Sequence, residues 1–162
     1  MKTLIVYYSY EGNSEAISKT IQEETGADVL CIEPQKEKKT KSLFRFVWGG
    51  MQVYMTKKPE LKPYKVKLEE YNTIFIGSPV WFGNYAPPIN TFLSENEIKS
   101  KNIGLFICSG NNKRNTFINF EKALEGNNII GEIEFVYPIK SGIEDARKNA
   151  KKWVKDCMKK VN

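Results

Sequence analysis

The stretch that decides the fold is Leu4-Ile5-Val6-Tyr7-Tyr8-Ser9-Tyr10-Glu11-Gly12-Asn13-Ser14. Its apolar first part is typical of a buried strand, and its polar part leads into Ala16, Ile17, Thr20 and Ile21, which recur at helical spacing. A strand, a short loop rich in glycine and hydroxyl groups, and a helix start direct free backbone N–H groups and the positive helix end at one point. The loop therefore predicts a phosphate site that needs no lysine. An ordinary helix cap with a glycine turn is the alternative.

The length and composition suit one globular domain over residues 1–162. With 162 residues and 41% hydrophobic content, the chain can bury a core of its own. No apolar run approaches the length of a membrane span, and the N-terminus has a strand pattern in place of a charged segment followed by an apolar signal region. We therefore expect a cytoplasmic, monomeric protein without membrane contact.

Missing residues and motifs exclude several kinds of chemistry. The sequence contains no histidine, which removes Ser-His-Asp and Cys-His catalysis and most transition-metal sites. It has neither the Gly-Lys-Ser/Thr loop of nucleoside triphosphatases nor a Gly-x-Gly-x-x-Gly dinucleotide motif after the first strand. Cys31, Cys108 and Cys157 lie far apart with no Cys-x-x-Cys pair. They are predicted to be reduced core residues, not metal ligands.

The net charge of +6 is concentrated in one segment, residues 36–67. This segment has ten Lys and Arg residues and two acids, a charge of +8, so the remainder of the chain carries −2. These basic residues either form a solvated surface or provide a docking surface for an acidic partner or a polyanionic substrate. Nucleic acid is not the expected partner, because the segment contains no known reading motif and its aromatic residues are spaced as in a packed helix.

The remaining pattern predicts an α/β fold. Apolar strand-like runs alternate with helical patterns, and this alternation predicts a parallel sheet covered on both faces. In the last run Glu132 and Glu134 alternate with apolar residues, as expected of an edge strand with one face partly exposed. The five predicted strands are residues 4–8, 29–32, 73–76, 103–108 and 133–137.

Three loops are expected to meet at one edge of this sheet. In a doubly wound sheet the ligand lies beyond the carboxyl ends of the strands, where the strand order reverses. Trp81, Phe82 and Tyr85 stand between glycines and prolines, and exposed aromatic rings at a strand end suit stacking on a flat heterocycle. Packing of these rings under the next helix is the alternative. The three loops are residues 9–14, 77–88 and 109–112.

Nearly end to end, the sequence resembles the flavodoxin family. Residues 75–88 are similar to the Gly-x-Pro-x-Trp-x-Gly-x-x-x-Pro-Pro stretch of many flavodoxin-domain proteins. The loop at residues 9–14 is similar to the family's hydroxyl-x-x-Gly-x-hydroxyl phosphate loop, and Ser109-Gly110 resembles its small-residue turn beside the flavin. The resemblance implies FMN as cofactor and a three-layer, doubly wound, flavodoxin-like sheet of five parallel strands in the order 2-1-3-4-5. The implied FMN-binding residues are Ser9, Tyr10, Glu11, Gly12, Asn13, Ser14, Pro79, Val80, Trp81, Phe82, Gly83, Ser109, Gly110 and Asn111.

Two features depart from the family pattern. Well-studied flavodoxins are strongly acidic, whereas this chain is basic because of residues 36–67, an insertion between the second and third strands. Many flavodoxins also place an aromatic residue after the fourth strand against the second flavin face, where residues 111–114 here read Asn-Asn-Lys-Arg. Either that face is open to a substrate or partner, or an aromatic residue of the insertion covers it. The candidates are Phe46, Trp48 and Tyr54.

The resemblance implies an electron carrier in which the protein sets how readily FMN accepts electrons. Its partners would be reductase and acceptor proteins, docking at residues 36–67. An FMN-dependent NAD(P)H:quinone or flavin oxidoreductase is the alternative, because Lys113 and Arg114 are placed to receive a phosphorylated nicotinamide or an acidic substrate. A flavin-free phosphoacceptor module is disfavoured, because small residues occupy the strand ends where such a module needs acids.

Overall fold

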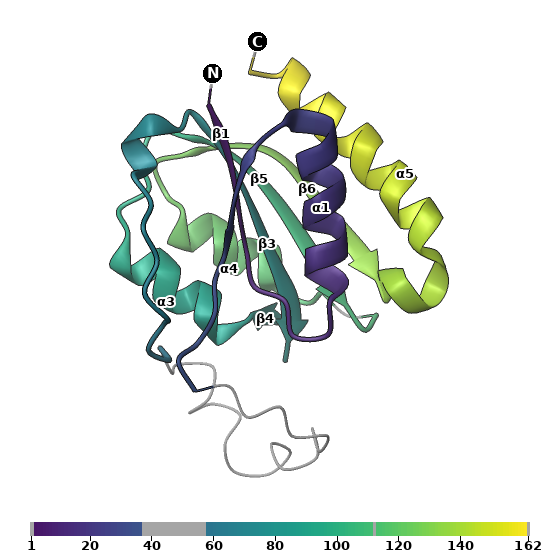
Figure 1. Ribbon diagram of the computed structural model, residues 1–162, viewed down its shortest axis with the longest axis horizontal. Helices are drawn as coiled ribbons and strands as arrows, with labels where there is room; N and C mark the ends of the chain where they lie inside the picture. The colour runs from purple at the N-terminus through teal and green to yellow at the C-terminus, as the bar shows by residue number, and fades with distance from the viewer. Residues whose placement is uncertain (1, 37–57, 112, 162) are drawn as a thin grey trace.

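A computed structural model describes residues 2–36, 58–111 and 113–161, in which strands alternate with helices (Figure 1). Helices cover both faces of a central sheet, which gives three layers. The elements are β1 (Thr3–Tyr7), α1 (Asn13–Thr25), β2 (Asp28–Cys31), the 3-10 helix η2 (Leu68–Glu70), β3 (Thr73–Trp81), β4 (Asn84–Tyr85), α3 (Pro87–Glu95), β5 (Asn102–Ser109), α4 (Thr116–Ala123), β6 (Asn128–Val136) and α5 (Pro138–Lys159).

The sheet confirms the predicted fold and strand order. Its order is β2-β1-β3-β5-β6, and these strands are parallel. The two-residue strand β4 pairs antiparallel with β3 and lies off this path, so without it the order is the predicted 2-1-3-4-5. The order reverses between β1 and β3, and the carboxyl ends of both strands lie at the lower edge of the sheet in Figure 1. A ligand of a doubly wound sheet is expected at this edge.

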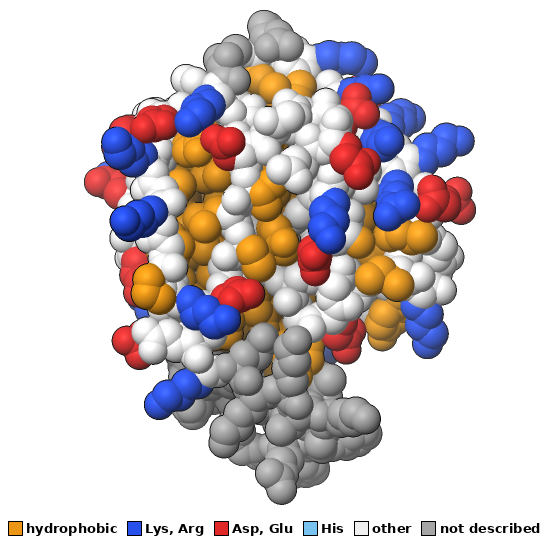
Figure 2. Space-filling model, viewed as in Figure 1, with side chains coloured by type: hydrophobic (Ala, Val, Ile, Leu, Met, Phe, Trp, Pro, Cys, Tyr) orange, Lys and Arg blue, Asp and Glu red, His pale blue; other side chains and the backbone are white. Residues whose placement is uncertain are grey.

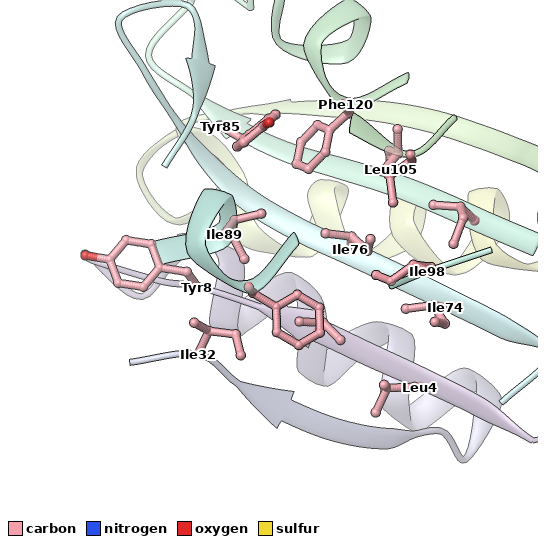
Figure 3. Packing of buried hydrophobic residues seen from close by; sticks show 14 of the residues in the cluster. Leu4, Tyr8, Ile32, Ile74, Ile76, Tyr85, Ile89, Ile98, Leu105 and Phe120 are labelled. Atoms are coloured by element: carbon pink, nitrogen blue, oxygen red, sulfur yellow. The ribbon is translucent and has the colours of Figure 1, made fainter. Parts of the chain in front are cut away.

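One core layer lies between the sheet and helices α3 and α4. Figure 3 shows Ile89 of α3 near Ile76, and Phe120 of α4 near Leu105. All four side chains are fully buried. A second layer lies between the other face of the sheet and helices α1 and α5, and it contains Ile5, Phe75, Phe106, Ile17, Ile21, Ala150 and Val154. These two layers are why the middle strands β1, β3 and β5 are apolar almost throughout.

A pair of glycines makes room for Trp153 of α5. Gly104 and Gly131 are partners in the β5–β6 register. A Cβ atom added at Gly104 would lie 3.3 Å from the Trp153 indole, and one added at Gly131 would lie 2.9 Å from it. The indole also meets the rings of Phe75 and Phe106 edge-on, with centroid distances of 5.5 and 6.5 Å. Glycine at both positions therefore lets a large aromatic ring close this side of the sheet.

Several elements extend beyond their predicted bounds. β6 begins at Asn128, because residues before the predicted run also pair with β5 across an irregularity at Ile103–Gly104. β3 continues to Trp81, and Asn84–Tyr85 turn back along it as β4. The prediction of a loop over residues 77–88 is therefore wrong in part, since most of that segment is a hairpin and the start of α3. The helix predicted after residue 14 is present as α1, and the chain ends in the long helix α5, inside which Gly142 has a non-helical φ of 130°.

The cysteines are divided between core and surface. Cys108 and Cys157 are buried, as predicted, whereas Cys31 is exposed. The prediction for Cys31 is wrong because β2 is an edge strand, of which only Leu30 is even half-buried. Burial raises the pKa of the Cys108 thiol to about 12, which keeps it protonated at neutral pH.

Basic residues also gather outside residues 36–67. Helix α5 has seven Lys and Arg residues and three acids, and Figure 2 shows many Lys and Arg side chains on its side of the molecule. The segment 36–67 is therefore one of two basic regions. Of its residues, 37–57 lie outside the described part of the chain.

Candidate functional site

The loop between β1 and α1 presents backbone N–H groups that its own side chains leave uncapped. α1 begins at Asn13, and its N-cap is Gly12, which has a left-handed φ of 84° and makes no side-chain cap. The side chain of Asn13 turns to α5, where its Oδ1 accepts a hydrogen bond from the backbone N–H of Ile139 at 3.3 Å. The positive end of α1 therefore faces the loop with donors available for an anion.

Two buried hydroxyl groups lie at the same loop. The Oγ atoms of Ser9 and Ser14 are buried and have no hydrogen-bond partner among the described residues. Ser18, one turn further along α1, contrasts with them, because its hydroxyl donates to the Ser14 carbonyl at 2.8 Å. Ser14 lies next to Cys108, and a hydrogen bond from its hydroxyl to the thiolate form opposes the rise that burial causes in the pKa of that thiol. Because the thiol is protonated at neutral pH, the Ser14 hydroxyl has no hydrogen-bond partner there. An unpaired buried hydroxyl costs about 1–3 kcal/mol, so a ligand that accepts these hydrogen bonds would stabilise the loop.

The second loop is a β-hairpin with two left-handed residues at its tip. Phe82 has a φ of 54° and Gly83 a φ of 80°, as in the type I′ turns that join two strands of a hairpin. Such turns favour Asn-Gly, and an aromatic residue at the first position is strained by about 1–2 kcal/mol. Strained residues of this kind cluster at functional sites. Phe82 is also 38% exposed, so its ring is available at the carboxyl edge of the sheet.

Ring contacts connect this hairpin to the first loop. Trp81 meets Tyr8 and Tyr10 edge-on, with a centroid distance of 5.7 Å in each pair. These contacts place the half-buried Trp81 next to the loop that holds the free donors. Tyr85 belongs to the core instead, because it is 8% exposed and its ring centroid is 4.3 Å from that of Phe120. Of the aromatic residues considered for stacking, Tyr85 is therefore the one that packs under a helix.

At the centre of the third loop is a serine hydroxyl group, which is hydrogen-bonded to a side chain of β6. The Oγ of Ser109 donates to Glu134 Oε1 at 2.6 Å and accepts from the backbone N–H of Asn111 at 3.1 Å. Asn111 has a left-handed φ of 97°. Gly110 lies against Tyr137, whose Oη would be 2.5 Å from a Cβ atom at that position. Contacts with Glu134 and with Tyr137 therefore hold this turn in a compact conformation.

Arg114, which follows the third loop, contacts the tip of the hairpin. A Cβ atom at Gly83 would lie 2.6 Å from Cδ of Arg114, so the stem of this arginine crosses the glycine. Arg114 itself has a left-handed φ of 40°. The contact places Arg114 at the tip of the hairpin, beside Gly83.

Sequence reasoning missed a fourth segment, at residues 136–139. Val136, Tyr137 and Ile139 are 40%, 44% and 51% exposed, and Figure 2 shows hydrophobic side chains on the lower right, over the start of α5. The backbone N–H of Tyr137 donates to the Ser109 carbonyl at 3.0 Å. Ile139 would be 3.7 Å from a Cβ atom at Gly12. The segment follows the carboxyl end of β6, so the rule that located the other loops applies to it as well.

All the sequence-predicted site residues are described, and they fall on the three loops. The first loop and the hairpin contact each other through Tyr10 and Trp81, and residues 136–139 contact the first loop at Gly12 and the third at Gly110. The aromatic candidates of the insertion, Phe46, Trp48 and Tyr54, lie outside the described residues. Within residues 2–36, 58–111 and 113–161 there is no group of three or more Cys, Asp and Glu side chains that could hold a metal ion. Nor does that part of the chain contain a helix long and apolar enough to cross a membrane.

Comparison with known proteins agrees with this architecture. A protein of Bacteroides uniformis ATCC 8492 described as a flavoprotein superposes with a TM-score of 0.73 at 23% identity, over 95% of this chain and 97% of that chain. A flavoprotein of Lactobacillus acidophilus NCFM in complex with FMN gives 0.70 at 22% identity, over 86% and 96%. Oxidised flavodoxin 2 of Bacillus cereus gives 0.63 at 20% identity, over 99% of each chain. At these identities the structures show a shared fold.

The family is shown by the sequence. A family profile described as Flavodoxin matches residues 2–157, which is nearly the whole chain and includes all three loops of the site. The chain therefore belongs to the flavodoxin family.

Proposed function

We propose that this chain binds FMN at the three loops and carries electrons between partner proteins. The observation that carries the proposal is the pair of unpartnered hydroxyls of Ser9 and Ser14 beside the uncapped N-terminus of α1. A phosphate monoester is a dianion that accepts several hydrogen bonds, and backbone N–H groups at a helix start bind it without a cation. Family membership and the FMN complex of the L. acidophilus protein agree with this ligand.

Each loop has a distinct part in the proposed site. The first loop, residues 9–14, would hold the phosphate. Its donors would be the hydroxyls of Ser9 and Ser14 and the backbone N–H groups of the loop, which include those of Tyr10, Glu11, Gly12 and Asn13. In the hairpin, Trp81 and Phe82 would give aromatic faces to the flavin ring, and Pro79, Val80 and Gly83 would line it. In the third loop Ser109, Gly110 and Asn111 would complete the wall. No catalytic residue is part of this proposal.

The chemistry comes from the cofactor, and the surrounding residues tune it. When bound, FMN accepts and releases one or two electrons. Exposed apolar side chains at the rim, Phe82, Tyr137 and Ile139, keep water away and lower the local dielectric, which disfavours added negative charge on the ligand. Lys113 and Arg114 act in the opposite direction. The balance between these groups sets how readily the site accepts electrons.

Redox partner proteins are proposed to dock partly at residues 36–67. In the described end of this segment, residues 60–67 line most of a groove of about 660 Å³. The lining has three lysines, Lys62, Lys65 and Lys67, and two acids, Glu60 and Glu95. Lys62 pairs with Glu33 and Lys67 with Glu70, whereas no ion pair of Lys65 occurs among the described residues. An acidic partner would be attracted by this surface, and the rate of electron transfer should then fall as salt concentration rises.

A second candidate function is an FMN-dependent oxidoreductase that NAD(P)H reduces directly. Its specific support is the position of Arg114 at the tip of the hairpin, beside Gly83. A phosphorylated nicotinamide or an acidic substrate would be attracted there.

An anaerobic absorbance titration of the FMN-loaded protein separates these functions. NADH and then NADPH are added, with and without a flavodoxin reductase. For a carrier we expect the flavin absorbance to bleach only when the reductase is present. Rapid bleaching by NAD(P)H alone would replace the carrier proposal with the oxidoreductase, and failure to take up FMN would overturn both.

A further inference from the structure

We propose that Glu134 is a positioning residue, which fixes the turn at residues 109–111 in the conformation that the FMN site uses. The inference rests on the proposed function for its purpose, although the turn itself is a feature of the flavin-free chain. Glu134 lies on β6, outside the three loops, and acts through the hydroxyl of Ser109.

The register of the sheet brings the carboxylate to the turn. Glu134 is the partner of Ile107 in the β5–β6 pairing, and Ser109 lies two residues further along β5. Side chains two residues apart on a strand share a face, so Glu134 and Ser109 meet on the same side of the sheet. Their oxygen atoms are 2.6 Å apart, a distance typical of a hydroxyl that donates to a carboxylate.

This contact decides which way the Ser109 hydroxyl points. A serine hydroxyl can donate one hydrogen bond, and here it donates that bond to the carboxylate of Glu134. The lone pairs of Ser109 Oγ are then available to the backbone N–H of Asn111, which lies 3.1 Å away. Without Glu134 the hydroxyl is free to rotate, and Asn111 loses a fixed acceptor.

The conformation that is held in this way is an unusual one. Asn111 has a φ of 97°, which L-residues rarely adopt and which persists only when surrounding contacts maintain it. The backbone N–H of Tyr137, which donates to the Ser109 carbonyl at 3.0 Å, restrains the first residue of the turn. The two hydrogen bonds that connect Glu134 to Ser109 and Ser109 to Asn111 restrain the last residue of the turn.

The carboxylate also contributes a negative charge near the wall of the site. Such a charge opposes the addition of electrons to a bound ligand. Removing the charge while keeping the hydrogen bond should therefore raise the reduction potential of the bound flavin, an effect that a purely structural role does not produce. Glu134→Gln makes this change, because its amide oxygen still accepts from Ser109.

Glu132 provides a matched control. It lies two residues earlier on the same face of β6, and its side chain makes no hydrogen bond with the described residues. Glu132→Ala therefore removes a similar charge and a similar side chain without touching the chain of hydrogen bonds to Asn111.

The test compares Glu134→Ala, Glu134→Gln, Ser109→Ala, the double variant Glu134→Ala/Ser109→Ala, and Glu132→Ala. Amide exchange of Asn111 is measured by NMR in the flavin-free proteins, and FMN affinity and reduction potential in the loaded ones. We expect Glu134→Ala to speed exchange and to weaken FMN binding, each by about tenfold. The double variant should be no worse than either single variant, Glu134→Gln should bind normally at a raised potential, and Glu132→Ala should exchange and bind FMN like the wild type.

Unchanged Asn111 exchange in Glu134→Ala would overturn the inference, as would additive losses in the double variant or equal effects of Glu132→Ala. Failure of the proposed function has a different signature, because the wild-type protein would then not bind FMN at all while exchange at Asn111 still responded to Glu134→Ala.

Discussion

Replacing Ser14 with alanine should have opposite effects on ligand binding and on stability. The Ser14 hydroxyl is buried without a partner among the described residues, which costs the flavin-free protein about 1–3 kcal/mol. Ser14→Ala removes this cost, so the free energy of unfolding should be maintained or increase. In the complex the same hydroxyl would donate to a charged phosphate, which contributes about 1.5–3 kcal/mol. FMN affinity should therefore fall by about 10- to 100-fold.

Ser18 supplies the matched control for this variant. It is as buried as Ser14, at 1% exposure, but its hydroxyl already donates to the Ser14 carbonyl. Ser18→Ala brings the same gain in helix propensity, loses a satisfied hydrogen bond, and should leave FMN affinity unchanged. Urea unfolding of the flavin-free proteins gives the stabilities, and quenching of FMN fluorescence gives the affinities. The reasoning is refuted if Ser14→Ala binds FMN as tightly as the wild type, or if it destabilises the flavin-free protein as much as Ser18→Ala does.

Four further outcomes are expected. Gly83→Ala should lower the unfolding free energy by more than Gly26→Ala does. Both glycines have positive φ, which costs roughly 1 kcal/mol for alanine, but only at Gly83 would the added Cβ meet a side-chain atom, 2.6 Å away. Thermal unfolding of the two variants measures the difference. Phe82→Asn should stabilise the hairpin by roughly 0.5–1 kcal/mol, since asparagine suits its left-handed φ of 54°, and should weaken FMN binding because a ring is lost; unfolding and FMN titration check both signs. Trp153→Ala should cost about 2–3 kcal/mol in urea unfolding, less than the loss of a fully buried aromatic residue, because the half-buried indole packs against Phe75 and Phe106. Burial raises the pKa of the Cys108 thiol from about 9.0 to about 12, so the folded state keeps a proton that the unfolded state loses, and the unfolding free energy should decrease as the pH rises from about 9 towards 12. Cys108→Ala should make this decrease smaller without abolishing it, because burial also raises the pKa of Cys157, to about 11.

Each of these outcomes has a direct contradiction. Equal losses from Gly83→Ala and Gly26→Ala would mean that the hairpin tip is not tightly packed. Loss of stability in Phe82→Asn would mean that the phenylalanine is not strained. A cost below about 1 kcal/mol for Trp153→Ala would place the indole outside the core, and a pH profile unchanged by Cys108→Ala would show that this thiol does not contribute to the dependence.

The first loop and the sheet order could be predicted because their signals are local. The apolar run before Ser9 and the helical spacing after Ser14 define a strand, a loop and a helix without reference to the rest of the chain. Alternation of such units then implies a parallel sheet, and the rule that ligands lie at the carboxyl edge identifies the three loops.

The hairpin and the fourth segment could not be predicted in this way. Residues 77–88 are rich in glycine and proline, which suggests a loop, and a phenylalanine at a left-handed position contradicts the usual preference for Asn-Gly. The alternation of Glu132 and Glu134 with apolar residues indicates only an edge strand with one face partly exposed. The actual partner of Glu134, Ser109, depends on the β5–β6 register, which involves residues that are distant in sequence.

Side-by-side titration of the flavin-free protein with FMN and with riboflavin is the most direct measurement of the phosphate loop. The two ligands share the ring and the ribityl chain, so only the phosphate distinguishes them. The unpartnered hydroxyls of Ser9 and Ser14 and the uncapped start of α1 predict that FMN binds at least about 100-fold more tightly. Equal affinity for the two ligands would contradict a phosphate site at residues 9–14.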